Sequence, residues 1–221
     1  MILAALLGAL LVGTSGAFAN VQRHAVAGHF NVMHPRASAP PANSDNFVTN
    51  GSFESGKVDG GWYQCGDVNA YTTTEHPYAG EYDEYSGTPT GNMEPQGNSG
   101  VCQLIAIPPD GVLTARLYQL SDEANTNYAY QEADLLDDRG NVVVNLYKSV
   151  NNKAGWVLGT WNLAAYAGKI YWLYFGVHGD GQPNFATEQF LDDVILTRGS
   201  APLPASPASP SPRPPADAPR I

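Results

Sequence analysis

The stretch VCQLIAIPPDGVLTARLYQL, residues 101–120, holds two alternating runs on either side of a turn sequence. In the second run apolar side chains occupy every other position: Leu113, Ala115 and Leu117. Alternation with a period of two is typical of a β-strand that is buried on one face. Pro-Pro-Asp-Gly at 108–111 favours a tight turn. The stretch therefore predicts two strands separated by a short connection.

The same pattern recurs along the rest of the chain. Strand-like runs occupy residues 128–136, 142–150, 155–163, 169–178 and 188–197. DDRGN at 137–141 predicts a hairpin between the first two of these runs. No stretch keeps a helical apolar period for three turns, and only NLAAYAG at 162–168 favours one short helical turn. We predict an all-β fold, a two-sheet antiparallel β-sandwich of jelly-roll type.

The chain divides into one predicted domain and its flanks. Residues 1–19 predict a signal peptide, because an apolar run ends in Ala17-Phe18-Ala19, an A-x-A cleavage pattern. A membrane anchor is the alternative, but the run is too short to span a bilayer. Residues 20–45 are expected to be a flexible spacer and 199–221 a Pro-rich tail. The sandwich itself is expected over 46–198.

Charge and cysteine content limit the partners and the compartment. The chain has 11 Lys+Arg against 21 Asp+Glu and a formal net charge of −10. This composition excludes nucleic acids and disfavours anionic membranes, which leaves neutral polymers, cations and proteins. Cys65 and Cys102 predict one disulfide in an oxidising compartment, with two buried thiols as the alternative. Neither belongs to a C-x-x-C pair, so zinc is not expected.

Four segments carry a resemblance to a known group of modules. They are NGSFESG (50–56), HPYAGEY (76–82), WNLAAYAGKIYWLYFGVHGDG (161–181) and FLDDVILT (190–197). Together they resemble galactose-binding-like jelly rolls, such as carbohydrate-binding modules of families four, nine and twenty-two. They are also similar to the C-terminal β-sandwich modules of secreted bacterial sedolisin-type peptidases. The resemblance spans residues 46–198 and implies a secreted, non-catalytic binding module.

In similar jelly rolls the first and last strands lie side by side, and a structural calcium often sits at their edge. The resemblance implies that Glu54, a carbonyl near Gly80 and Asp192 would hold this ion, because calcium requires six to eight oxygen ligands. Strand parity places Asp192 on one face with three apolar residues: Phe190, Val194 and Leu196. The alternative is that Asp192 only caps backbone amides and that Glu54 is solvated.

Parity also predicts a sugar-binding surface. If the strands at 112–120, 128–136 and 169–178 are neighbours, their outward side chains combine rings with hydrogen-bonding groups. These side chains are Arg116, Tyr118, Tyr130, Glu132, Asp134, Trp172, Tyr174 and His178. Sugars stack on aromatic rings and pair their hydroxyls with such groups. The alternative is ordinary cross-strand aromatic pairing, in a structural or protein-interaction module with no sugar site.

Catalysis is not expected. The acids of EADLLD (132–137) are spaced like those of some glucanases. However, Leu135-Leu136 and the turn that follows favour the start of a hairpin. The chain has no G-x-S-x-G and no H-E-x-x-H sequence. We therefore expect a secreted or envelope-associated module that binds a polysaccharide or cell-surface glycan.

Overall fold

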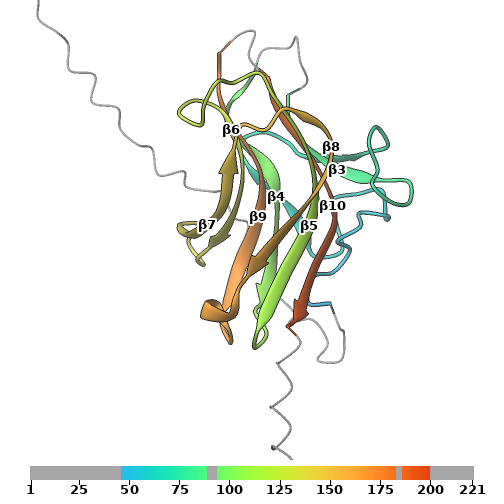
Figure 1. Ribbon diagram of the computed structural model, residues 1–221, viewed down its shortest axis with the longest axis vertical. Helices are drawn as coiled ribbons and strands as arrows, with labels where there is room; N and C mark the ends of the chain where they lie inside the picture. The colour runs from blue at the N-terminus through green and yellow to red at the C-terminus, as the bar shows by residue number, and fades with distance from the viewer. Residues whose placement is uncertain (1–45, 89–93, 183–185, 200–221) are drawn as a thin grey trace, which may run out of the picture.

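The computed structural model describes residues 46–88, 94–182 and 186–199 (Figure 1). The predicted signal peptide, the spacer over 20–45 and the tail beyond Gly199 lie outside the described residues. No helix in the described part of the chain is long and apolar enough to cross a membrane.

Ten strands form two five-stranded sheets whose strands all pair antiparallel, so the predicted two-sheet β-sandwich is confirmed (Figure 1). Sheet I has the order β1 (Trp62–Gly66), β4 (Gln96–Ala106), β9 (Ile170–Asp180), β6 (Tyr130–Leu136), β7 (Val142–Ser149). Sheet II has the order β2 (Tyr71–Thr73), β3 (Asp83–Gly87), β10 (Thr187–Arg198), β5 (Gly111–Ser121), β8 (Lys153–Asn162).

The core lies between the sheets and is built by the alternating side chains. Leu113, Ala115 and Leu117 of β5 are buried, as the alternation predicts. From sheet I the core receives three residues of β9: Leu173, Phe175 and Val177. The residues between these positions point to the outer faces of the sheets, because successive strand side chains point to opposite sides.

The β6–β7 hairpin and the short helical turn are also confirmed. The Asp137 carboxylate accepts the amide protons of Arg139 and Asn141 at 2.9 and 2.8 Å, which fixes the turn. Gly140 has φ +78°, a conformation that glycine adopts without steric cost. The single helical turn is a 3-10 helix at Ala164–Tyr166.

Two short strands of sheet II, β2 and β3, have no counterpart among the predicted runs. The sequence of β3 is DEYSG, and both of its acids, Asp83 and Glu84, are fully buried. Acidic residues are depleted in strands, so this segment carries none of the usual strand signal. Its position beside β10 nevertheless makes it important for the site described below.

The opening motif lies against the last strand, as the resemblance implies. The amide of Phe47 donates to the Leu196 carbonyl at 2.7 Å, and the Val194 amide donates to the Gly51 carbonyl at 2.9 Å. A Cβ at position 51 would collide with the Val194 carbonyl, so this contact requires glycine. The turn then directs Phe53 into the core, where its ring is fully buried.

A β-bulge in β10 corrects one prediction from strand parity. The pairing with β5 changes register between Asp192 and Ile195, and Asp193 has φ +47°. Val194 and Leu196 belong to the core, whereas Asp192 lies on the outer side of sheet II. The expectation that these residues share one face, together with Phe190, is wrong, because the bulge reverses the alternation.

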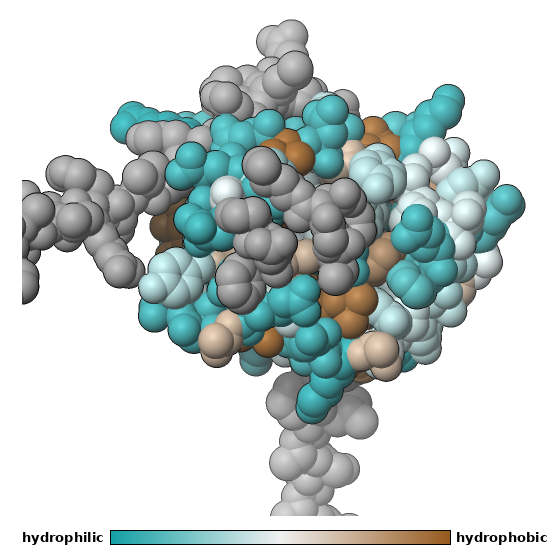
Figure 2. All heavy atoms as spheres, turned by 90° about the horizontal axis from the view of Figure 1, so that it is seen from above, coloured by the Kyte–Doolittle hydropathy of each residue, from teal (hydrophilic) through white to brown (hydrophobic). Residues whose placement is uncertain are grey.

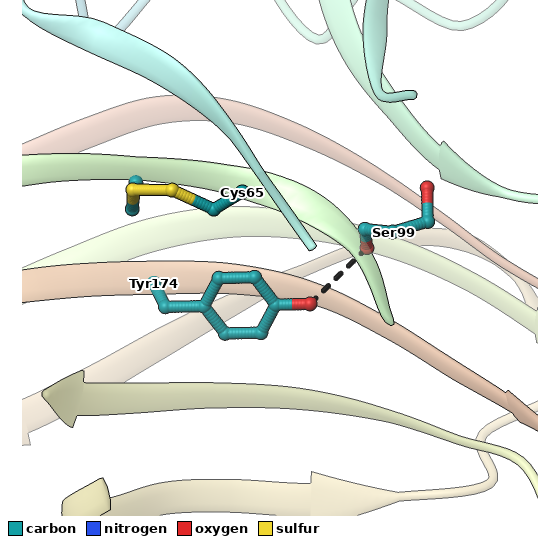
Figure 3. Close-up of a disulfide and its surroundings, with 4 residues drawn as sticks. Cys65, Ser99 and Tyr174 are labelled. Carbon is teal, nitrogen blue, oxygen red and sulfur yellow. Dashed lines mark hydrogen bonds between the residues drawn. A yellow bond between two sulfur atoms is a disulfide. The ribbon is translucent and has the colours of Figure 1, made fainter. Parts of the chain in front are cut away.

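The predicted disulfide between Cys65 and Cys102 is present, with the two Cα atoms 5.8 Å apart (Figure 3). It joins β1, the edge strand of sheet I, to its neighbour β4. Both cysteines lie on the outer face of this sheet, in a small apolar cluster with Trp172 and Tyr174.

Candidate functional site

The eight residues of the predicted sugar-binding surface are divided between the two sheets. β6 and β9 are neighbours in sheet I, and Tyr130 lies opposite His178. β5 belongs to sheet II, where it lies between β10 and β8. Arg116 and Tyr118 therefore face away from the other six residues. The expectation of one continuous surface is wrong, because parity separates inward from outward side chains but does not say which sheet a strand joins.

Two carboxylates lie next to each other on the outer face of sheet I. Glu132 and Asp134 occupy alternate positions of β6 and are only 7% and 1% exposed. The Asn145 side-chain amide donates to Asp134 Oδ1 at 2.7 Å. Asp134 Oδ2 is buried and has no hydrogen-bond partner within the described part of the chain. Lys148 of β7 lies opposite Glu132.

The burial of this pair changes its protonation. Burial raises the pKa of Glu132, and the charge of Asp134 raises it further. Burial also raises the pKa of Asp134, although the Asn145 hydrogen bond and Lys148 oppose the change. The pair therefore keeps a proton to a higher pH than free carboxylates do. A protonated carboxyl beside an ionised one offers both a hydrogen-bond donor and acceptors.

A stacked pair of rings borders these carboxylates. The rings of Tyr130 and His178 are 4.9 Å apart at an interplanar angle of 19°. Lys148 Nζ lies 3.3 Å from the Tyr130 ring centroid, a cation–π contact. The Nδ1 atom of His178 is 2.7 Å from Asn98 Oδ1. Burial lowers the pKa of His178, and Lys148 adds to this effect, so the ring is neutral near pH 7.

Trp172 and Tyr174 face outward from the core but are buried, with exposed fractions of 3% and 0%. The Tyr174 hydroxyl donates to the Ser99 carbonyl at 3.2 Å, as Figure 3 shows. A Cβ at Gly176 would collide with the Tyr174 side chain, so the absence of one leaves room for this ring. Trp172 packs against Tyr63 edge-on, with centroids 5.9 Å apart. Buried rings support the sheet and offer no face to a sugar.

The outer face of sheet II carries a second group of rings, here called the sheet II aromatic cluster: Tyr78, Tyr118, Trp156, His76 and Arg116. The Arg116 guanidinium lies 4.2 Å from the Tyr78 ring centroid. Tyr118 stacks on His76 at 4.5 Å and 10°. Trp156 meets the Tyr78 and Tyr118 rings edge-on, each at 5.8 Å. The arginine and the rings thus contact one another within this cluster.

Glu54, the first residue of the predicted calcium site, holds a loop through backbone amides. Its carboxylate accepts the amide protons of Glu81 and Tyr82 at 3.0 and 3.1 Å. Gly80 packs directly against this carboxylate and has φ +74°. Glu54 is exposed to solvent, but its carboxylate is fixed by the loop amides.

Asp192 binds the preceding residues of the same loop. Its Oδ2 atom accepts the amide protons of Tyr78 and Ala79 at 3.0 and 3.1 Å. Its Oδ1 atom accepts the amide proton of Asp193 at 2.6 Å. Amide protons thus point at the oxygens of both Glu54 and Asp192, but Asp192 Oδ1 accepts only one of them, which leaves one of its lone pairs for a cation. The set of Glu54, Gly80 and Asp192 does not by itself form an all-oxygen shell.

Asp83 is the residue that the sequence analysis missed. It is fully buried on β3, and neither carboxylate oxygen has a hydrogen-bond partner among the described residues. Burial raises the pKa of Asp83 to about 7, with a further contribution from the charge of Asp192. Burial likewise raises the pKa of Asp192 to about 6. An acidic residue buried without a partner points to a missing cation or a retained proton.

Comparison with known proteins finds similar solved structures only at low sequence identity. No protein-family model matches the chain, and no curated protein sequence matches it significantly. The solved structure of TmCBM61 in complex with β-1,4-galactotriose is 18% identical, with a TM-score of 0.49, over 71% of this chain and 100% of that one. The K3 adhesin domain of Lys-gingipain from Porphyromonas gingivalis is 18% identical, with a TM-score of 0.48, over 69% and 99%.

A family twenty-two module, as the resemblance implies, is also similar. The CBM22-1 xylan-binding domain of Paenibacillus barcinonensis Xyn10C is 18% identical, with a TM-score of 0.40, over 71% of this chain and 97% of that one. These three similar solved structures are two carbohydrate-binding modules and one adhesin domain. At these identities and TM-scores the likeness supports no conclusion about the ligand, which has to be argued from the residues of the site.

Proposed function

We propose that this protein is a non-catalytic module that binds a neutral glycan at the outer face of sheet I. The contact residues would be Tyr130, Glu132, Asp134, Lys148 and His178, here called the sheet I polar site. The observation that carries the proposal is the Glu132–Asp134 pair beside the Tyr130–His178 stack. The disulfide supports an oxidising, extracytoplasmic location.

The chemistry of the sheet I polar site suits sugar hydroxyls. A carboxyl pair that shares a proton can both accept from and donate to a vicinal diol. Asp134 Oδ2, which lacks a partner among the described residues, gains most from a hydroxyl donor, because an unpaired buried acceptor is costly. Tyr130 is partly exposed, and because its ring already contacts the His178 ring and Lys148 Nζ, it would border the bound sugar rather than offer a free stacking face.

Replacing Asp134 with asparagine or Tyr130 with alanine is expected to weaken glycan binding. Hydrogen bonds to charged groups contribute about 1.5–3 kcal/mol, so the loss in affinity should be roughly tenfold to hundredfold. Binding would be measured by affinity electrophoresis in β-galactan, xylan and β-glucan, and by calorimetry with oligosaccharides of any polymer that retards the protein.

The matched control is Tyr78→Ala, which removes a partly exposed ring from the sheet II aromatic cluster. Affinity should stay within about twofold, because Tyr78 lies on the opposite sheet. Far-UV and near-UV circular dichroism would verify that each variant is folded. Wild-type levels of binding by folded Asp134→Asn and Tyr130→Ala, or loss of binding by Tyr78→Ala alone, would remove the glycan site from sheet I.

A second candidate is a structural or protein-interaction module with no sugar site. It is favoured by the burial of Trp172 and Tyr174, since these two rings of the sheet I face are not available for stacking. This candidate predicts that none of the tested polysaccharides retards the wild-type protein. Reproducible retardation that Tyr130→Ala abolishes would decide in favour of glycan binding.

We further propose that a calcium ion binds at Asp83 and Asp192, beside the loop that Glu54 holds. The two unpartnered oxygens of Asp83 would be ligands of the ion, because calcium prefers carboxylate oxygens. Glu54 and Gly80 would then act by shaping the loop rather than as primary ligands. The ion would neutralise two adjacent acids on neighbouring strands and fix the loop over 78–82.

Calcium is expected to raise the melting temperature. Free calcium at about 100 times its dissociation constant stabilises by roughly 2.7 kcal/mol, which corresponds to roughly 5–11 °C for a domain of this size. Asp83→Asn should lose the part of the calcium increment that binding at this site supplies. Glu54→Gln should melt at a lower temperature than the wild type both in chelator and in calcium, but its calcium-dependent increment should remain. The measurement is a thermal melt in EDTA and in millimolar calcium.

Asp138→Asn serves as the control, because Asp138 is an exposed acid in the β6–β7 turn. Its calcium increment should equal that of the wild type. A wild-type melt that calcium does not change would contradict the proposal. Loss of the increment in Glu54→Gln, with Asp83→Asn unaffected, would return the ion to the predicted set of Glu54, Gly80 and Asp192.

A further inference from the structure

A separate group of acids lies at the end of the sandwich where β9 ends and β10 begins. Glu94, Glu123 and Asp180 each bring one carboxylate oxygen within 4.8 Å of the others. Glu94 precedes β4, Asp180 ends β9 and Glu123 follows β5, so the group spans both sheets. Figure 2 views this end from above, and its visible surface is mainly hydrophilic.

Glu94 provides the second observation. Its side chain is only 2% exposed, and Oε1 is buried without a hydrogen-bond partner among the described residues. Its other oxygen, Oε2, is 3.4 Å from the Asp180 amide, a long contact. A Cβ at position 179 would lie 2.9 Å from Glu94 Cγ, so Gly179 leaves room for this carboxylate at the end of the interior.

The three carboxylates of this group carry like charges and repel one another. The charges that act most strongly on Glu94 are those of Asp180 and Glu123, and both are negative. Burial, with these two charges, raises the pKa of Glu94 to about 7. Three convergent carboxylates, one of which has a buried unpartnered oxygen, require either a proton or a cation. Asp180 is already oriented, because its Oδ1 atom accepts the Gln182 amide proton at 3.0 Å.

We propose that Glu94, Glu123 and Asp180 bind a calcium ion that joins the two sheets at this end of the sandwich. All three ligands are hard oxygen donors, which favour calcium and magnesium over zinc or copper. They come from three separate segments, and calcium tolerates such irregular geometry, whereas magnesium demands a near-ideal octahedron. Water would complete the shell on the exposed side, where Glu123 and Asp180 are only partly buried.

The test uses the full chain with calcium chloride alone as the probe, at pH 8. In an Asp83→Asn background, which removes the site on sheet II, calcium should still raise the melting temperature by roughly 5–10 °C at 100 times its dissociation constant. Adding Glu94→Gln or Glu123→Gln should abolish this remaining increment. Calorimetry should give two calcium ions per wild-type chain and one per Glu94→Gln chain. Magnesium at equal concentration should give a smaller shift.

A sign reversal separates this site from a structural role of Glu94. In chelator Glu94→Gln should melt at or above the wild-type temperature, because it removes an unpartnered buried charge, whereas in calcium it should melt below the wild type. A calcium increment that survives Glu94→Gln in the Asp83→Asn background would overturn the site, as would no increment in Asp83→Asn alone. Loss of all calcium response in Glu94→Gln alone would instead support this site and eliminate the one at Asp83 and Asp192.

Discussion

Replacing Phe53 with alanine is expected to lower the free energy of unfolding by about 3–5 kcal/mol, the usual cost of deleting a fully buried aromatic ring. The ring is 0% exposed and packs against Trp62 with centroids 5.3 Å apart. The cavity left by the ring would not collapse easily, because hydrogen bonds fix this segment to β10. Chemical denaturation followed by tryptophan fluorescence would measure the change.

The control for Phe53→Ala is Tyr63→Ala, which removes a ring that is 37% exposed. It should cost about 1 kcal/mol or less, since only its edge contact with Trp172 is lost. Phe53 also has φ +54°. Glycine tolerates this conformation better than alanine, so Phe53→Gly should be no less stable than Phe53→Ala. Equal stabilities of wild type and Phe53→Ala would mean that the opening motif is not part of the core.

Acidification from pH 8 to pH 5 is expected to stabilise the protein in chelator. Burial raises the pKa of Asp83 and of Glu94 to about 7, and that of Asp192 to about 6. The folded chain therefore binds more protons than the unfolded chain in this window, and its free energy of unfolding falls as pH rises. The gain at pH 5 should be on the order of 5 kcal/mol, or roughly 10–20 °C in melting temperature.

His178 opposes this trend, because its pKa is lowered by burial and protonation of the folded state is disfavoured at low pH. One such group is outnumbered by the buried acids. The sharpest variant is Glu84→Gln. Burial raises the pKa of Glu84, which lies fully buried on β3 with Oε2 unpartnered among the described residues. Glu84→Gln should be more stable than the wild type at pH 8 and should flatten the pH profile.

A wild-type melting temperature that falls on acidification from pH 8 to pH 5 would contradict this assignment of raised pKa values. Asp137→Asn provides the opposite control. Hydrogen bonds from Asn141 lower the pKa of Asp137, so its ionised form stabilises the turn at pH 8 and this contribution is lost at low pH. Asp137→Asn should therefore leave the acid-stabilised trend of the buried carboxylates in place.

Most of the strands could be predicted from the sequence, because their side chains alternate. β5 buries every other residue, β9 directs every other residue into the core, and the DDRGN turn between β6 and β7 contains the glycine that its conformation requires. β3 could not be predicted, because it is buried on both faces and yet contains two acidic residues, Asp83 and Glu84, which are rare in strands.

The candidate site was only partly predictable. Parity correctly directs Tyr130 and Glu132 outward, but it cannot distinguish the sheet that holds them from the one that holds Tyr118. That distinction depends on hydrogen bonds between strands far apart in sequence. The bulge after Asp192 was not predictable either, because the residue pattern does not show where an extra residue enters the strand. Glu94, Glu123 and Asp180 are separated by long stretches of chain, and only the meeting of both sheets brings them together.

The contact between the opening segment and β10 has a consequence for synthesis on the ribosome. Asn46 accepts the amide proton of Leu196, 150 residues later in the chain. Translation at about 5–20 residues per second separates the emergence of these two partners by roughly 8–30 s. During that interval Phe53 has no neighbouring last strand to hold its segment in place. The N-terminal segment can therefore reach its final packing only after β10 has been synthesised, so the domain completes its fold only when its translation is finished.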